Sequence, residues 1–134
     1  MADGAEIVSV VVLDASAMLA LLLGEPGAEA VRSKLSAAVI SAVNYSEVLS
    51  RTAALCGSFD EAKRRVDRQG VEVIPLDDAL AAVAATLSPI GKPFGLSLAD
   101  RGCLALALTR RAPVLTAARD WQRFDLGIPI VFIR

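Results

Sequence analysis

The sequence predicts an α/β fold with three layers, α/β/α, in which a mostly parallel sheet of about five strands lies between helices. Short apolar segments rich in β-branched residues alternate along the chain with longer segments that favour helix, which is typical of parallel βαβ units. Hydrophobic residues make up 54% of the chain but aromatic residues only 4%, so the core must be aliphatic, as it is where helices pack closely on a sheet. The 134 residues suffice for one domain with its own core, and we predict a single domain over 1–134.

The first half of the chain predicts two strands, each followed by helices. Residues 7–13 are a β-branched, apolar run of strand length, and the helix-favouring run 15–23 after it ends at Gly24. Pro26 suits the first turn of a second helix that ends near Leu35. The next predicted elements are a strand at 39–41, a helix from Asn44 to about Leu55, and a charged helix at 59–69 after the break at Gly57 and Ser58.

The second half continues this alternation, with no repeat or linker that would divide the domain. A strand at 71–74 leads to a helix at 77–87, and the prolines and glycines of 88–95 predict a loop. Ser97 opens a long helix. This helix ends near Arg110, and the elements predicted after it are a strand at 114–116, a short helical turn near Trp121 and a final strand at 130–133.

The apolar run from Ile7 to Leu23 also raises the question of a membrane span or an export signal. In a bilayer, Asp14 would lie near the centre at a cost of roughly 2.5 to 3.5 kcal/mol, and no positive charge precedes the run. A buried strand followed by a buried helix explains the same run better. We therefore expect no membrane association.

The chain contains no histidine, and this absence excludes several classes of catalytic site. Ser-His-Asp and Cys-His nucleophiles, HExxH zinc sites and histidine general bases all require the missing side chain. The two cysteines, Cys56 and Cys103, form no CxxC pair, and we expect free, buried thiols in a cytoplasmic protein. Carboxylates are the main catalytic groups that remain.

Three acidic residues lie where a predicted strand and a predicted helix meet, namely Asp14, Glu47 and Asp100. The first two each follow a strand, and the helix of Asp100 must run back to reach the strand at 114–116, so all three belong at the carboxyl edge of the sheet. Converging carboxylates repel one another, and a divalent cation relieves that repulsion. Oxygen ligands without His or Cys favour Mg²⁺ or Mn²⁺ over zinc.

Each acid also has a structural interpretation, which the sequence leaves open. Ser97 and Asp100 have the spacing of a capping box, and Asn44 and Glu47 nearly have it, so either acid could satisfy amides at a helix N-terminus. Asp14 is harder to explain in this way. It lies between two apolar runs, no basic residue occurs among the first 25 residues, and a lone buried carboxylate is costly.

Five segments, spread in order over almost the whole chain, resemble a known family: VVLDASAMLALLLGEPG, NYSEV, GLSLADRGCLALA, PVLTAARDW and GIPIVFIR. Together they are similar to the PIN-domain proteins of the VapC toxin type. The resemblance implies a PIN-like fold and an endoribonuclease that depends on Mg²⁺ or Mn²⁺ and leaves a 5′ phosphate and a 3′ hydroxyl. It also implies a homodimer whose partner is a cognate VapB-like antitoxin.

The resemblance further assigns roles to individual residues. The family's first three acidic metal ligands, which are its catalytic residues, match Asp14, Glu47 and Asp100. The polar positions that commonly border the family's site match Ser16, Asn44 and Thr116. These three also have simpler interpretations, in which the two hydroxyl residues serve turns or caps and the asparagine is a helix N-cap.

One position departs from the family pattern, because its fourth acid falls two residues after Thr116, where this chain has Ala118. Asp120 is close in sequence, but on a helical turn a residue two positions further on points to a nearly opposite face. It replaces the missing acid only if the backbone there is irregular, and an exposed acid in a first turn is the simpler interpretation. Two functions therefore remain open, a ribonuclease and a weakened or inactive protein of this fold that acts through dimerisation and antitoxin binding.

The distribution of charge supports RNA binding only weakly. With 14 basic and 15 acidic residues the net charge is −1, so no overall positive field attracts nucleic acid. One local cluster lies on the predicted charged helix and is a candidate RNA contact; it consists of Lys63, Arg64, Arg65 and Arg68. A solvated helix face is the alternative interpretation, and the commoner one for a run of charges.

Overall fold

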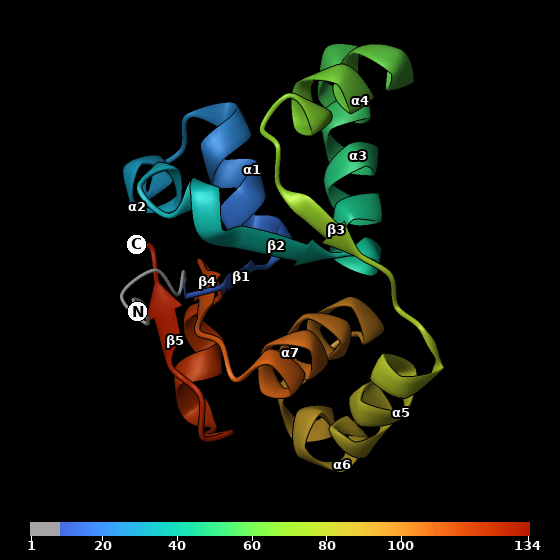
Figure 1. Cartoon of the computed structure of the whole chain (residues 1–134), viewed down its shortest axis with the longest axis vertical. Helices are drawn as coiled ribbons and strands as arrows, with labels where there is room; N and C mark the ends of the chain where they lie inside the picture. The colour runs from blue at the N-terminus through green and yellow to red at the C-terminus, as the bar shows by residue number, and fades with distance from the viewer. Residues whose placement is uncertain (1–8) are drawn as a thin grey trace, which may run out of the picture.

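The computed structural model describes residues 9–134, and these residues form a five-stranded sheet in which all neighbouring strands are parallel. The order across the sheet is β3-β2-β1-β4-β5 (Figure 1). The strands are β1 (Val11–Leu13), β2 (Ala38–Ser41), β3 (Glu72–Ile74), β4 (Val114–Thr116) and β5 (Ile130–Phe132). The predicted parallel α/β fold is therefore confirmed. Residues 7 and 8 of the predicted first strand lie outside the described residues.

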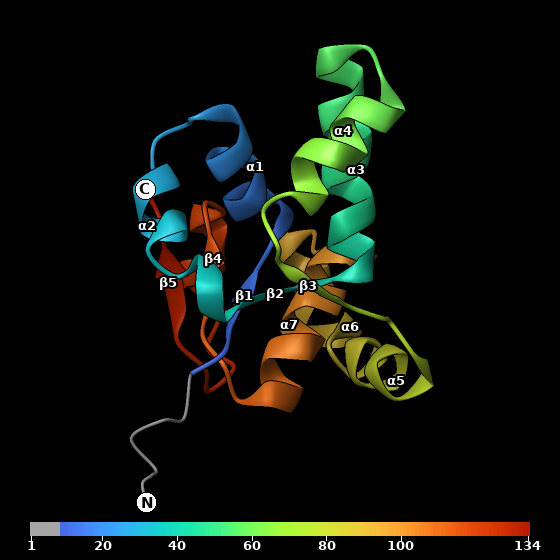
Figure 2. The same ribbon diagram turned by 45° about the horizontal axis from the view of Figure 1, so that its top comes forward.

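Helices cover both faces of the sheet and complete the three layers. They are α1 (Ala15–Leu23), α2 (Ala28–Arg32), α3 (Ala42–Cys56), α4 (Phe59–Asp67), α5 (Asp78–Thr86), α6 (Ser88–Gly91) and α7 (Leu98–Arg110), with the short 3-10 helices η2 (Leu35–Ala37), η3 (Lys92–Phe94) and η4 (Arg119–Arg123). Figure 1 shows α1 to α4 on one side of the sheet and α5 to α7 on the other. In Figures 1 and 2 the pair α3–α4 extends beyond the sheet.

The core consists of two aliphatic clusters, one on each face of the sheet. Because side chains of a strand point alternately to opposite faces, Val11 and Leu13 join the cluster under α1, whereas Val12 joins the cluster under α7. Met18 of α1 and Leu104 of α7 are among the largest fully buried side chains of these clusters. The central strand is thus buried on both faces, as the continuous apolar run predicts.

The structure differs from the prediction at several places, and two of these differences have a clear local cause. The second helix begins at Ala28 and not at Pro26, because the turn before it contains Gly27 with φ +98°, where a Cβ would lie 2.7 Å from the carbonyl oxygen of Ile133. The predicted loop at 88–95 is wrong, since this segment forms α6 and η3. Pro lies in the first turn of each, where its fixed φ is suitable and no amide proton is needed.

The connections of the sheet place a crevice at the carboxyl ends of β1 and β4. From β1 the chain continues to β2 and β3 on one side, and it later returns to β4 and β5 on the other. Leu13 lies in register with Ile40 of β2 and with Leu115 of β4, so the residues that follow these three meet at one edge. In open α/β sheets, ligands bind in the crevice at such a change of direction.

The apolar run that raised the question of a membrane span forms β1 and α1 within the described residues. Between residues 9 and 134, no helix combines the length and the apolar character needed to cross a membrane.

Candidate carboxylate site

Asp14 lies directly after β1, in the crevice between β1 and β4, and is only 5% exposed. Its Oδ1 accepts hydrogen bonds from the Ser16 hydroxyl at 2.7 Å and from the Ala17 amide at 2.9 Å. Its Oδ2 accepts a hydrogen bond from Thr116 Oγ1 at 2.5 Å. Asp14 is therefore the N-cap of α1 and also joins α1 to the end of β4.

Two backbone amides that follow β4 fix the direction of these hydroxyl groups. The amide of Ala117 donates to Ser16 Oγ at 2.8 Å, and the amide of Ala118 donates to Thr116 Oγ1 at 2.9 Å. Since each hydroxyl oxygen already accepts an amide proton, its own proton is directed to Asp14. Ser16 and Thr116 thus orient the carboxylate of Asp14.

The charge of Asp14 is only partly compensated. Burial raises the pKa of Asp14 above its ordinary value of 3.8, and the hydrogen bonds from Thr116, Ser16 and Ala17 lower it without offsetting burial. The negative charge of Asp100 raises this pKa further. Within residues 9–134 Asp14 forms no ion pair. A bound cation would stabilise a carboxylate in this environment.

Asn44 connects Glu47 to α7. The N-cap of α3 is Ser41, so Asn44 occupies the third helical position and the prediction that it caps the helix is wrong. Glu47 lies in the second turn, too far along for a capping role. Asn44 is 1% exposed, and its Nδ2 donates at 3.3 Å both to Glu47 Oε1 and to the carbonyl of Ala99 in α7. The asparagine therefore holds the second acid beside the helix that carries the third.

Asp100 has the capping role that its sequence position suggested, and it also lines the cavity that contains Asp14 and Glu47. It completes a capping box, in which its amide donates to Ser97 Oγ at 3.1 Å and its Oδ2 accepts the Ser97 amide proton at 2.9 Å. Gly102 allows α7 to approach α3 closely at this point, since a Cβ there would lie 2.9 Å from Val43 Cγ1. The close approach brings Asp100 into the cavity that contains the other two acids.

One cavity of about 310 Å³ contains all three predicted acids. Its walls come from α1, the turn after α1, α3, α7, the segment after β4 and the end of the chain. The lining residues are Asp14, Ser16, Leu19, Leu23, Glu25, Glu47, Arg51, Asp100, Ala118 and Arg134. Three acids that are far apart in the sequence thus meet at the carboxyl edge of the sheet.

The buried thiol of Cys103 supports the same convergence. Burial raises its pKa well above the ordinary value, and the charges of Asp14, Asp100 and Glu47 raise it further. All three carboxylates therefore lie within electrostatic range of one buried side chain. Both cysteines are free, as predicted, but Cys56 is only half-buried, so the prediction of two buried thiols is wrong for it.

The donor set of the cavity fits a hard divalent cation such as Mg²⁺ or Mn²⁺, because its ligands are carboxylate and hydroxyl oxygens. Within the described part of the chain, no three acidic or cysteine side chains already lie close enough together to hold an ion. One reason is that Asp100 Oδ2 is bonded to the Ser97 amide, while Glu47 is exposed at the mouth. Mg²⁺ usually keeps several waters and needs only one or two protein carboxylates, so the arrangement suits such an ion without a closed cage.

Three charged residues of the cavity were not predicted from the sequence. Arg134 donates to the carbonyl of Pro26 at 2.8 Å and pairs with Glu25 at 3.4 Å. These residues meet only because the end of the chain lies beside the turn after α1, and no local pattern reveals that. Arg51 follows Glu47 by four residues on one helix, a spacing that places both on one face and that the predicted helix could have indicated.

The position of the family's fourth acid is occupied by the methyl group of Ala118, which lines the cavity. Asp120 lies in η4, is exposed, and is not part of the lining. It therefore does not take the place of the missing acid. Among the described residues, the additional acid that lines the cavity is Glu25.

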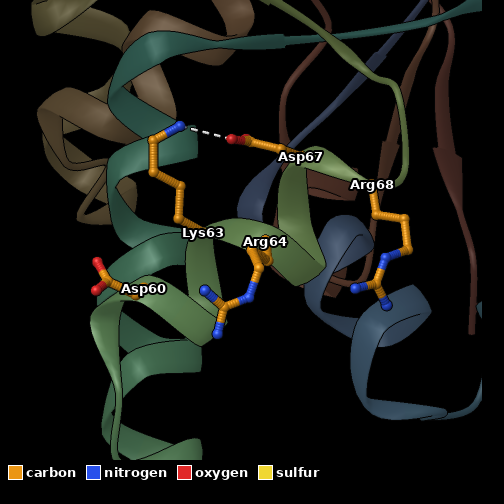
Figure 3. A pocket seen from close by; sticks show the side chains of 5 residues that line it. All are labelled: Asp60, Lys63, Arg64, Asp67 and Arg68. Carbon is orange, nitrogen blue, oxygen red and sulfur yellow. Dashed lines mark hydrogen bonds and ion pairs between the residues drawn. The ribbon is translucent and has the colours of Figure 1, made fainter.

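The basic residues of α4 form a second, separate hollow of about 580 Å³ (Figure 3). It is lined by Asp60, Lys63, Arg64, Asp67 and Arg68. Most of the basic side chains are paired one turn away on the same helix, since Lys63 Nζ lies 2.5 Å from Asp67 Oδ2, and Glu61 pairs with Arg64 and Arg65, each at 2.8 Å. These pairs favour the interpretation of this cluster as a solvated helix face.

Comparison with known proteins gives the family of this chain. The sequence model of the PIN domain matches residues 11–126. Among solved structures, VapBC2 of Rickettsia felis bound to a DNA fragment from its promoter is similar with a TM-score of 0.71 at 12% identity, over 92% of this chain and 98% of the other. DNA-bound VapBC of Salmonella typhimurium has a TM-score of 0.71 at 18% identity over 94% and 99%.

A toxin–antitoxin complex of Klebsiella pneumoniae has a TM-score of 0.68 at 21% identity over 92% of this chain and 98% of the other. At these identities the structures establish a shared fold. No curated protein sequence matches the chain. The matched family spans every strand except β5 and every acid of the cavity, and the chain belongs to the PIN domain family.

Proposed function

We propose that this protein is a VapC-type toxin that hydrolyses phosphodiester bonds of RNA with Mg²⁺ or Mn²⁺ at Asp14, Glu47 and Asp100. The observation that carries the proposal is the cavity at the carboxyl edge of the sheet, which these three acids line in a chain without histidine. PIN domains are generally nucleases, so the family supports the same class of reaction.

The contacts of each acid suggest its part in this reaction. Three hydrogen bonds hold the carboxylate of Asp14, so it is the fixed ligand of the site. Glu47 is exposed at the mouth and tethered on one oxygen by Asn44, which leaves its second oxygen available to accept a proton from the attacking water. When bound, the ion acidifies a water and shields the charge of the phosphate.

The proposal includes a VapB-like antitoxin as partner and a homodimer. The similar structures from Klebsiella pneumoniae and Salmonella typhimurium are themselves toxin–antitoxin or VapBC complexes, which supports a partner of this class. The end of α3 and the start of α4 each expose a large apolar side chain, with Leu55 68% and Phe59 57% exposed. Light scattering of the purified chain, alone and after co-expression with the protein encoded by the adjacent reading frame, tests both associations.

RNA cleavage tests the nuclease itself. The chain as given, Ala118→Asp and Asp14→Asn are compared on structured tRNA and rRNA with Mg²⁺ and with Mn²⁺. We expect cleavage by the chain, faster cleavage by Ala118→Asp because a further carboxylate enters the cavity, and far slower cleavage by Asp14→Asn. If none of the three proteins cuts any of these RNAs, the nuclease proposal fails.

Ala118 favours one second candidate function, that of a weakened or inactive PIN-fold protein that acts by binding its partner. The methyl group removes a carboxylate from the wall of the cavity, and Asp120 does not restore it. Cleavage that appears only with Ala118→Asp would assign this function to the chain. Cleavage by the unaltered chain excludes it.

A further inference from the structure

Arg51 brings a positive charge to the mouth of the carboxylate cavity. It is exposed and lines the cavity together with Asp14, Glu47 and Asp100. It lies one helical turn, about 6 Å, further out along α3 than Glu47, on the same helix face. Within residues 9–134 its guanidinium forms no ion pair and no hydrogen bond, although four acids line the same cavity.

Three other arginines of the molecule are engaged in ways that Arg51 is not. Arg134 lines the same cavity, but its guanidinium is held by Glu25 and the carbonyl of Pro26. Arg64 and Arg65 share Glu61 on the surface of α4. Arg51 is therefore the cavity arginine whose five donors remain available within the described structure.

An anionic substrate needs such a group at this cavity. The acids repel phosphate, and the net charge of −1 supplies no general attraction for RNA. A guanidinium matches two oxygens of a phosphate in a bidentate contact, and it stays charged at all relevant pH values. Leu23, 41% exposed on the cavity wall, adds an apolar surface beside the acids for a ribose or a base.

We infer that Arg51 binds a backbone phosphate of the RNA next to the bond that is hydrolysed, and so positions the strand across the three acids. The inference rests on the proposed function, because it assumes that RNA enters this cavity. Arg51, and not the basic cluster of α4, is then the contact that decides the affinity for RNA.

Equilibrium binding of a labelled single-stranded RNA to the full chain tests this role. Fluorescence anisotropy is measured over a range of salt concentrations with Ca²⁺, an oxygen-binding ion that occupies carboxylate sites, and gels verify that the RNA stays intact. The variants are Arg51→Ala, Arg51→Lys and, as a control, Arg64→Ala, which removes another exposed arginine from the neighbouring helix. Thermal unfolding of each variant checks that the fold is retained.

We expect Arg51→Ala to raise the Kd about tenfold, the loss of one hydrogen-bonded contact to a charged group. The slope of log K against log salt should fall by about 0.7, the value for one phosphate contact to a single strand. Arg51→Lys should keep the slope, since the charge remains, but not the full affinity, since the bidentate contact is lost. Arg64→Ala should change neither the Kd nor the slope.

Several outcomes overturn the inference. They are no measurable binding by the unaltered chain, an unchanged slope for Arg51→Ala, or an equal change of slope for Arg64→Ala. A failure of the proposed function looks different. In that case the slope depends on Arg51, but neither the chain nor Ala118→Asp cuts the bound RNA with Mg²⁺ or Mn²⁺.

Discussion

The molecule contains two charged hollows that are built in opposite ways. The hollow on α4 is made by a single helix, and most of its basic side chains are paired with an acid three or four residues away. The carboxylate cavity is made by segments from the whole chain, and its central hydrogen bond joins Asp14 to Thr116 across 102 positions. The hollow on α4 is exposed, whereas the carboxylate cavity contains Asp14, which is only 5% exposed.

The two hollows therefore differ in how many of their charges are available for chemistry. A charge that is neutralised by its neighbour on the same exposed helix contributes little and has few free donors or acceptors. A buried acid without a cation is costly to the fold and is kept where a ligand compensates it. The cavity, and not the larger basic hollow, is therefore the place where substitutions should alter function.

The largest effect is expected from Asp14→Asn. Cleavage of RNA should fall by about 10²- to 10³-fold, the loss typical for removing a group that stabilises the transition state. The free energy of unfolding should rise, because the asparagine amide has nearly the shape of the carboxylate but no charge to bury. Single-turnover cleavage and urea unfolding measure the two effects, with Asp120→Asn as the exposed control.

The stability difference should depend on pH. Because burial raises the pKa of Asp14 in the folded protein above its ordinary value of 3.8, the unaltered protein loses stability as pH rises from that value through the raised pKa. The variant has no such loss, so its advantage in free energy of unfolding should grow over this range and then level off. An advantage that is largest at low pH would contradict the assigned cost of the buried carboxylate.

The next largest effect is expected from Asn44→Ala. It removes the donor shared by Glu47 and the Ala99 carbonyl, and loss of a buried hydrogen-bonding partner costs about 1–3 kcal/mol in free energy of unfolding. Cleavage should also slow, since Glu47 loses its tether. Urea unfolding and cleavage rates are compared with those of Ser46→Ala, an exposed substitution on the same helix. Equal effects of both substitutions would show that Asn44 has no special part in the site.

A smaller effect is expected where α7 crosses α3. Gly102→Ala places a Cβ 2.9 Å from Val43 Cγ1, and the strain of about 1–3 kcal/mol is partly offset by a gain of about 1 kcal/mol in helix propensity. We expect a net loss of about 1 kcal/mol. A double-mutant cycle with Val43→Ala tests whether this contact causes the loss, because removing the valine methyls should cancel the strain. Additive effects of the two substitutions would place the cost elsewhere.

The smallest effect is expected from the basic hollow. Hydrogen bonds from Arg65 and Arg64 lower the pKa of Glu61 to about 2, so Arg64→Ala and Arg65→Ala should each move this pKa towards its ordinary value of 4.5. The contribution of these pairs is present above that ordinary value and is lost as pH falls towards 2. NMR titration of the Glu61 carboxyl measures the shift. RNA cleavage by both variants should remain unchanged, and a clear decrease would assign α4 to the substrate.

Several elements could be predicted because their signals are local. The first helix ends at Gly24 as predicted, Ser97 and Asp100 form the capping box that their spacing predicts, and the strand at 114–116 has the predicted bounds. The start of α3 could not be predicted in this way, because Asn44 looks like an N-cap but is used as a buried link to α7. A tertiary contact there overrides the local preference of the residue.

The class of fold and the three acids are readable from the sequence, since strand and helix periods, caps and the absence of histidine are properties of neighbouring residues or of composition. How the acids are held, and which other charges line their cavity, depends on contacts between segments that are distant in the sequence. Thr116 reaches Asp14 because β4 lies beside β1, and Arg134 reaches Glu25 because the chain ends beside the turn after α1. Contacts between distant segments leave no periodic trace in the sequence, because they depend on strand order and close helix packing.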